Sequence, residues 1–280
     1  MTIGAMLRRD IPPADLAAVA ADIDGPFEEL WIVEDLPYAG GIAQMTQVLA
    51  ATNFAKVGHG IAPTPFRHPV ALAMEWAALA TMYPGRVITG IGHGVQQWMA
   101  QIGAAVDSPL TLLEENLDCV TGLLGGREIS LSGRYVDVTG VKLKFPPPIV
   151  PPVLAGVTGP RSLRLAGAKA DGVILPEGWG PNDIANARLK MTQGAGSDQR
   201  HLTVFAAFYV GSPDDLGRPP GDSDKSWLAA GSHGHDVAEK LQTLIEAGAD
   251  SLILMPIGPS PAYQLELAAA QVLPELTDHP

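Results

Sequence analysis

Eight short apolar runs alternate with segments of helical periodicity along almost the whole chain, and this alternation constrains the fold more than any single motif. Several runs are continuously apolar, such as VILP and SLILMP, which is typical of parallel strands covered on both faces. Eight β/α units in about 250 residues predict an α/β fold, the (β/α)8 TIM barrel. The predicted strands are Ile3–Leu7, Glu29–Val33, Lys56–Ala62, Val87–Ile91, Pro152–Val157, Asp171–Leu175, Leu202–Val210 and Ser251–Pro256.

One segment interrupts this alternation after the fourth predicted helix. That helix begins at Ser108–Pro109, where a serine N-cap precedes a first-turn proline. Residues 127–150 then carry alternating apolar positions around Ser132–Gly133 and end in a proline-rich connector. We therefore expect a short insertion with a β-hairpin, carried by a single barrel domain that spans residues 1–280.

The composition of the chain excludes several classes of binding partner. The formal net charge of −12 argues against nucleic acid or an anionic membrane surface. Cys119 is the only cysteine, so the chain has no disulfide framework and no cysteine-based metal cluster. No segment has the character of a signal peptide or the length of a membrane span. We expect a cytoplasmic protein, a homodimer, that acts on a small molecule and binds neither nucleic acid nor membranes.

A glycine-rich stretch, GIGHGVQQWMAQIG, follows the fourth predicted strand. Gly90, Gly92 and Gly94 are spaced as G-x-G-x-G, whereas a dinucleotide fingerprint requires G-x-G-x-x-G. Two interpretations stay open. The glycines either form a tight turn at the barrel rim or allow a flat ring to approach the backbone closely.

A second stretch, AGVTGPRSL, leads from a strand into a helix that begins at Pro160. The amides and the positive dipole at such a helix end suit a phosphate group. We expect the amides of Thr158 and Gly159 to bind a phosphate, with Arg161 near enough to assist. The alternative interpretation is an ordinary turn between a strand and a helix.

Two carboxylates, Glu34 and Asp35, end the second predicted strand in VEDLPYAGG. Carboxylates close together raise the pKa of one of the pair, which suits an acid/base group. Alternatively, the two side chains point in opposite directions and one caps a helix.

Three histidines follow strands or begin helices. His59 and His93 end neighbouring strands and could share a metal with Asp35, but the chain has no tight histidine spacing such as H-E-x-x-H. We therefore expect no metal. His68 precedes Pro69 at a helix start, which favours a structural role.

Taken in order, several segments resemble the bacterial luciferase-like family of flavin and deazaflavin oxidoreductases. The resemblance covers nearly the whole chain, and its specificity comes from the order of five segments. They are FEELWIVEDLPYAGGI, KVGHGIAPTPFRHPVALAMEWAALATMYPGRVITGIGHG, GRYVDVTGVKLKFPPP, GVTGPRSLRLAGAKADGVIL and AEKLQTLIEAGADSLIL.

The resemblance implies which residues meet the cofactor. Gly60–Ile61 falls where deazaflavin-binding members have a non-proline cis peptide that backs the ring. GVTGP matches the phosphate-binding turn, and Gly92 to Gly94 match the strand-four loop along the cofactor. The cofactor-binding residues that we expect are Glu34, Gly60, Ile61, Gly92, His93, Gly94, Trp98, Val157, Thr158, Gly159, Pro160 and Glu177.

The resemblance also implies where the chemistry lies. Glu34–Asp35 matches the family's Asp-His pair, so Asp35 stands where related sugar-phosphate dehydrogenases carry a histidine. Val95 stands where those enzymes carry a glutamate, and both departures argue against a sugar-phosphate substrate. We expect Asp35 near the ring's reacting carbon and Glu34 at the ring's polar edge. His93 is the alternative proton donor, because an unperturbed histidine already titrates near neutral pH.

The implied cofactor is FMN or coenzyme F420. RHP after the third strand and GP at the phosphate turn resemble the methylenetetrahydromethanopterin reductase branch, which favours F420. The expected function is hydride transfer between F420 and a small organic substrate, whose identity the sequence leaves open. The alternatives are an FMN-dependent monooxygenase that uses oxygen and a non-catalytic flavin-binding protein of the same fold.

Overall fold

The computed structural model describes residues 1–196, 198–212, 216 and 226–277. Eight parallel strands close into a barrel in the order β12-β1-β2-β3-β5-β8-β9-β10, because β10 pairs with both β9 and β12. The TIM barrel that the sequence predicts is therefore confirmed. The barrel strands are β1 (Thr2–Met6), β2 (Glu29–Ile32), β3 (Lys56–His59), β5 (Val87–Gly92), β8 (Val153–Gly156), β9 (Gly172–Leu175), β10 (His201–Val210) and β12 (Ser251–Pro256).

The third predicted strand is shorter than expected. The ladder of β3 stops at His59, the peptide bond between Gly60 and Ile61 is cis as predicted, and a two-residue strand β4 (Ala62–Pro63) then pairs with β5. A further short strand, β11 (Ala229–Gly231), pairs with β10 and was not predicted.

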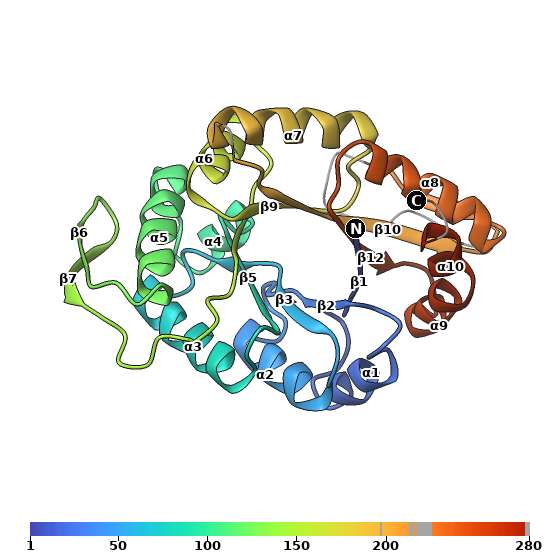
Figure 1. Ribbon diagram of the computed structural model, residues 1–280, viewed down its shortest axis with the longest axis horizontal. Coiled ribbons are helices and arrows are strands. Elements are labelled where there is room, and N and C mark those ends of the chain that lie inside the picture. The colour runs from blue at the N-terminus through green and yellow to red at the C-terminus, as the bar shows by residue number, and fades with distance from the viewer. Residues whose placement is uncertain (197, 213–215, 217–225, 278–280) are drawn as a thin grey trace.

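Helices surround the ring of strands (Figure 1). His68 caps α3 by accepting a hydrogen bond from the amide of Val70, which confirms its structural role. A short helix in the loop after β5, α4, was not predicted because one and a half turns carry little periodicity. The helices are α1 (Leu16–Asp22), α2 (Gly41–Ala51), α3 (Pro69–Met82), α4 (Gln96–Gln101), α5 (Pro109–Leu124), α6 (Pro160–Lys169), α7 (Pro181–Ala195), α8 (Gly234–Glu246), α9 (Pro261–Leu267) and α10 (Leu273–Thr277), with a π-helical turn at Ala268–Val272.

The predicted hairpin is present beside α5 (Figure 1). Strands β6 (Ile129–Ser132) and β7 (Asp137–Val141) pair in antiparallel register. Glu115 of α5 anchors the turn, because its carboxylate accepts hydrogen bonds from three successive backbone amides at 2.6–2.9 Å. The insertion is thus fixed to the outside of the barrel.

The inside of the barrel is filled by side chains. Trp31 is fully buried there, stands edge-on to Phe205 with ring centroids 5.6 Å apart, and donates to Glu29 at 2.8 Å. Gly58 is required beside it, since a Cβ at that position would lie 2.3 Å from the indole ring. The packed interior separates the two ends of the barrel from each other.

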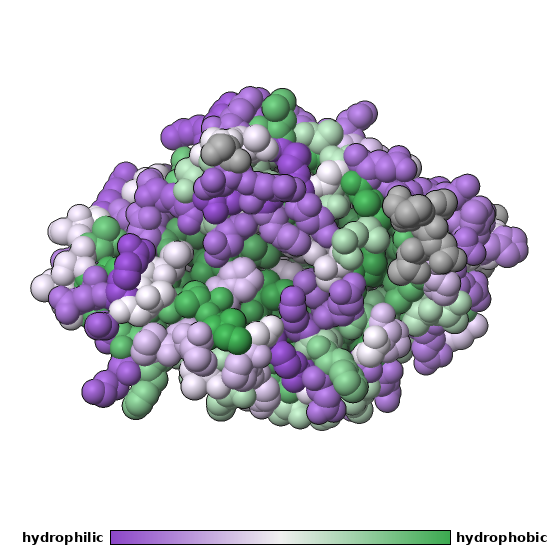
Figure 2. All heavy atoms as spheres, viewed as in Figure 1, coloured by the Kyte–Doolittle hydropathy of each residue, from purple (hydrophilic) through white to green (hydrophobic). Residues whose placement is uncertain are grey.

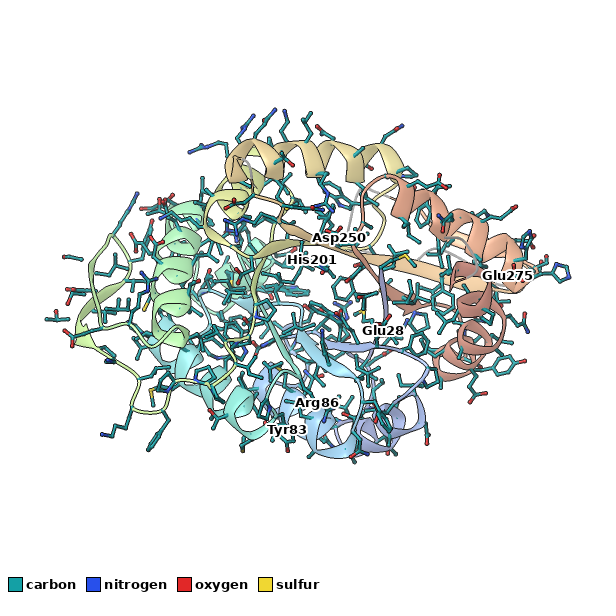
Figure 3. All side chains as sticks on the ribbon, viewed as in Figure 1. Glu28, Tyr83, Arg86, His201, Asp250 and Glu275 are labelled. Atoms are coloured by element: carbon teal, nitrogen blue, oxygen red, sulfur yellow. The ribbon has the colours of Figure 1, made fainter. Side chains whose placement is uncertain are left out.

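The N-terminal ends of the strands carry residues that stabilise loops. In Figure 3, Glu28, Arg86, His201 and Asp250 mark this end, since each begins or directly precedes a strand. Arg86 donates to the carbonyls of Thr52 and Ala55 at 2.8 Å. A hollow here is lined by Met1, Thr2, Asp171, Gln199, Arg200, His201, Ala249 and Asp250. Barrel enzymes place their chemistry at the opposite end, so this hollow is not the candidate site.

The face shown in Figure 2 is mostly hydrophilic over α7 and α8. Hydrophobic side chains gather on it over the segment between β7 and β8, where Ile149 and Val150 are about half exposed. In the part of the chain that the structure describes, no helix has both the length and the apolar character needed to cross a membrane.

Candidate active site

The loops after the barrel strands bring the predicted site residues to one end of the molecule. Because all barrel strands are parallel, their C-terminal ends share one rim, and this rim is where barrel enzymes carry their active sites. Each residue of the predicted site follows a barrel strand. Glu34 and Asp35 follow β2, Gly60 and Ile61 follow β3, Gly92, His93, Gly94 and Trp98 end or follow β5, Val157 to Pro160 follow β8, and Glu177 follows β9.

Glu34 is 5% exposed and is surrounded by hydrogen-bond donors. Arg67 donates to both carboxylate oxygens, with Nη1–Oε2 at 2.9 Å and Nη2–Oε1 at 2.5 Å. The amide of Gly41, at the start of α2, donates to Oε1 at 2.9 Å. Glu34 therefore ties the loops after β2 and β4 to each other through one carboxylate.

These donors decide the charge of Glu34. Burial by itself would raise the pKa of this carboxyl, but His59, Arg67 and the Gly41 amide outweigh it and lower the pKa to about 2. The predicted rise in pKa from a neighbouring carboxylate is not found at Glu34, because the hydrogen bonds and the positive charge of Arg67 outweigh both burial and any effect of Asp35.

Asp35 has a different cation as its partner. Arg9, from the loop after β1, donates from Nη1 to Oδ2 of Asp35 at 2.9 Å. The same guanidinium lies 5.1 Å from the ring centre of Tyr38 and 6.0 Å from that of Trp98. Asp35 thus belongs to a half-exposed cluster that joins the loops after β1, β2 and β5, whereas Glu34 is buried.

His59 lies beneath Glu34 and is fully buried. Its Nε2 is 3.4 Å from Oε2 of Glu34, and its ring stands edge-on to Trp76 at 5.9 Å. Burial lowers the pKa of His59, with Glu34 acting in the opposite direction. A Cβ on Gly41 would lie 2.2 Å from Nε2, so glycine is needed there. Among the described residues no group of three or more His, Cys, Asp and Glu side chains could hold a metal ion.

The glycine-rich strand end makes room for the side chain of Ile61. A Cβ on Gly156 would lie 2.6 Å from Cγ2 of Ile61, and one on Gly92 would lie 3.2 Å from its Cδ1. A Cβ on Gly90 would lie 3.3 Å from the same Cγ2. We call Gly90, Gly92 and Gly156 the glycine socket. Two of the three glycines of GIGHG therefore leave room for the side chain of Ile61, which follows β3. The third, Gly94, has a positive φ of +68°, which a turn requires.

His93 bridges two helices with its two ring nitrogens. Nδ1 lies 3.2 Å from the carbonyl oxygen of Pro109 at the start of α5, and Nε2 lies 3.1 Å from Oγ of Ser162 on α6. Burial lowers the pKa of His93, and the bond to Pro109 acts in the opposite direction. Its ring is thus engaged by protein groups at the side of the rim where β8 runs into α6.

The start of α6 has the features of an anion-binding helix end. Gly159 is its N-cap in extended conformation, and among the described residues no side chain caps it. Pro160 is the first helical residue, Thr158 and Pro160 are exposed, and Val157 is buried beneath them. The amides of the first turn are therefore left to a ligand or to water. Glu177, in the next loop, is half-buried.

Three polar residues of this region were missing from the predicted site, namely Arg9, Arg67 and Ser162. Arg9 and Arg67 are 26 and 33 residues away from their carboxylate partners, so no spacing in the sequence connects them. Ser162 is separated from His93 by 69 residues.

Known proteins match this chain in sequence and in fold. Residues 4–216 match the family described as luciferase-like monooxygenase. The chain belongs to the luciferase-like monooxygenase family. A relative in sequence is the 5,10-methylenetetrahydromethanopterin reductase of Methanolobus tindarius, which is 26% identical over 87% of this chain and 71% of the relative.

Two solved structures show how far the fold is shared within the luciferase-like monooxygenase family and its neighbours. The coenzyme F420-dependent tetrahydromethanopterin reductase of Methanopyrus kandleri has a TM-score of 0.85 and 22% identity, over 98% of this chain and 99% of the other. An F420-dependent secondary alcohol dehydrogenase, solved with an F420-acetone adduct, has a TM-score of 0.84 and 18% identity over 99% of both chains.

Proposed function

We propose that this protein is an oxidoreductase that transfers a hydride between coenzyme F420 and a small organic substrate. The observation that carries the proposal is that an uncapped helix end and the seated Ile61 side chain lie on the same rim of the barrel. A helix end of this kind fits a phosphate, and the Gly60–Ile61 segment on the same rim matches the segment that backs the ring in the family that the sequence resembles. Several relatives and structural neighbours are named as F420-dependent, which supports that cofactor over FMN.

The residues around these two features would hold the cofactor. The amides of Thr158 and Gly159 would bind the phosphate with help from Arg161, next to Pro160 and above Val157. Ile61 with Gly60 would back the ring, and Gly92, His93 and Gly94 would lie along the cofactor. Trp98 and Glu177 would complete the surroundings from the loops after β5 and β9.

When bound, the deazaflavin supplies or accepts the hydride, so the protein has to supply position and a proton. Asp35 is the proposed catalytic residue, because it is the carboxylate at the exposed edge of the rim. Glu34 is a positioning residue in this scheme, since Arg67 and the Gly41 amide already occupy its oxygens and hold α2 and the β4 loop in place.

Titration of the purified protein with F420 and with FMN tests the proposal through the absorbance and fluorescence of the two cofactors. We expect tight binding of F420, weaker binding of FMN, and strong loss of both with Gly159→Val. Ala168→Val on the exposed side of the same helix is the matched control and should bind as the wild type does. Tight FMN binding with oxygen consumption would instead support the monooxygenase alternative, and binding without turnover would support the non-catalytic one.

A further inference from the structure

We propose that His93 and Ser162 form a proton-coupled phosphate-binding pair: His93 gains a proton when the cofactor phosphate binds, and Ser162 then donates its hydroxyl hydrogen to the phosphate. The inference rests on the proposed function and assigns His93 to the phosphate instead of to the reacting ring.

The hydrogen-bond partners of His93 determine where its hydrogens lie. The Pro109 carbonyl can only accept, so the Nδ1 that lies 3.2 Å from it must carry a hydrogen. In a neutral imidazole the other nitrogen, Nε2, is then an acceptor. It lies 3.1 Å from Oγ of Ser162, so the Ser162 hydroxyl must donate to it. With His93 neutral, Ser162 presents only lone pairs to its surroundings.

That state does not suit an anion at the start of α6. Ser162 is the third residue of the helix and belongs to the turn whose amides a phosphate would meet. A phosphate oxygen accepts hydrogen bonds, so it would face the lone pairs of the Ser162 hydroxyl. A charged His93 removes the conflict, because Nε2–H then donates to Oγ and frees the hydroxyl hydrogen for the phosphate.

The groups around His93 are neutral, so His93 gains a proton only when a phosphate is present. The neutral Pro109 carbonyl of α5 and the Ser162 hydroxyl of α6 face its ring, and the Gln96 amide of α4 donates to its backbone carbonyl. Burial keeps the pKa of His93 low, and a bound anion acts in the opposite direction.

The exchange makes cofactor binding pH-dependent. Between the low pKa of His93 in the empty protein and its raised pKa in the complex, each bound phosphate takes up as much as about one proton. In that range the affinity falls by up to about tenfold for each unit of rising pH, and it levels off above the raised pKa.

Calorimetric titration in two buffers of different ionisation enthalpy measures this proton uptake directly. The ligands are F420 and the deazaflavin riboside that lacks the phosphate, or FMN and riboflavin if the protein prefers FMN. We expect uptake with the phosphorylated ligand and none with the other. His93→Gln, which cannot titrate, should abolish the uptake, whereas uptake by the phosphate group itself would persist in this variant.

The serine is tested in the same titrations. Ser162→Ala should weaken binding of the phosphorylated ligand about tenfold or more, as expected for a lost hydrogen bond to a charged group, and leave the phosphate-free ligand unaffected. Ser162→Thr, which keeps the hydroxyl, should bind as the wild type does, and His68→Gln, a change in the α3 cap, should keep the proton uptake.

The outcomes separate the two proposals. Binding of the cofactor without proton uptake, or with uptake that survives His93→Gln, overturns the inference and leaves the proposed function standing. Failure of both F420 and FMN to bind overturns both. Circular dichroism of each variant separates a lost fold from a lost hydrogen bond.

Discussion

Arg67 and Glu34 form a two-pronged ion pair at the rim of the barrel, with both terminal nitrogens of the guanidinium on the two carboxylate oxygens at 2.9 and 2.5 Å. Glu34 is almost completely buried, whereas the Arg67 side chain is 23% exposed. A carboxylate in this position cannot exchange its partner for water, so the pair fixes the loop between β4 and α3 on the end of β2.

Removal of the guanidinium should therefore destabilise the protein markedly. We expect Arg67→Met to lower the free energy of unfolding by about 3 kcal/mol, because it leaves a buried carboxylate without its cation. Arg134→Met is the matched control, since Arg134 pairs with Asp107 at the surface and such pairs contribute about 0–1 kcal/mol. Urea denaturation at neutral pH measures both, and equal losses would contradict the special role of Arg67.

The same pair predicts a loss of stability in acid. Because folding lowers the pKa of Glu34 from 4.5 to about 2, its contribution is complete above about pH 4.5 and disappears as the pH falls toward 2. The full contribution is on the order of 3 kcal/mol. The difference in unfolding free energy between wild type and Glu34→Gln should thus shrink from pH 6 to pH 2. A difference that stays constant over this range would show that folding does not shift the pKa of Glu34.

The glycine socket can be tested by filling it. In Gly156→Ala the new methyl group would meet Cγ2 of Ile61 at 2.6 Å, and such overpacking costs about 1–3 kcal/mol. Because the nearest atoms to this methyl all belong to Ile61, Ile61→Ala should restore stability in the double variant. Gly92→Ala meets the backbone oxygen of Gly156 at 2.6 Å, so Ile61→Ala should not rescue it. Thermal unfolding of the two single and two double variants gives the comparison.

A fourth prediction concerns the proposed proton donor. Asp35→Asn should reduce turnover by about 10²–10⁴-fold, the usual contribution of general acid catalysis, while F420 affinity stays nearly unchanged. The assay follows the absorbance of F420 as it is oxidised or reduced. Acetone, isopropanol and methylenetetrahydromethanopterin are the test substrates. His93→Gln should instead change F420 affinity and its pH dependence. Full turnover in Asp35→Asn together with lost turnover in His93→Gln would reverse the two assignments.

The barrel could be predicted from the sequence because each strand and each helix is encoded by a continuous run of residues. Runs such as SLILMP cover a whole strand, and β12 matches its predicted bounds of Ser251–Pro256. The break after His59 was not visible as a strand boundary, since no proline, aspartate, asparagine or serine interrupts KVGHGIA. Strand β11 and helix α4 are too short for periodicity to identify them.

The site was harder to predict because its partners are distant in sequence. The adjacency of Glu34 and Asp35 suggested that they act on each other, yet each is bonded to an arginine from a different loop. Which arginine each carboxylate binds depends on the directions in which Glu34 and Asp35 point and on which cations the neighbouring loops carry. The resemblance suggested a phosphate turn and a ring site, but it contained no information about the arginines of this particular chain.

The glycine socket also bears on how a saturation-mutagenesis map of this protein should be interpreted. A side chain at Gly156 would overlap Ile61, and one at Gly92 would overlap the backbone oxygen of Gly156, so almost every substitution there should fail a growth or activity screen. Asp35 is part-exposed, and a Cβ on Gly159 would have only Oγ of Ser162 near it, at 3.8 Å, so both positions should tolerate changes that preserve folding and lose only chemistry or ligand affinity. In such a map the least tolerant positions would be those where an added side chain has no room. The catalytic and ligand-binding residues would be recognised only if the amount of folded protein and its turnover are scored separately.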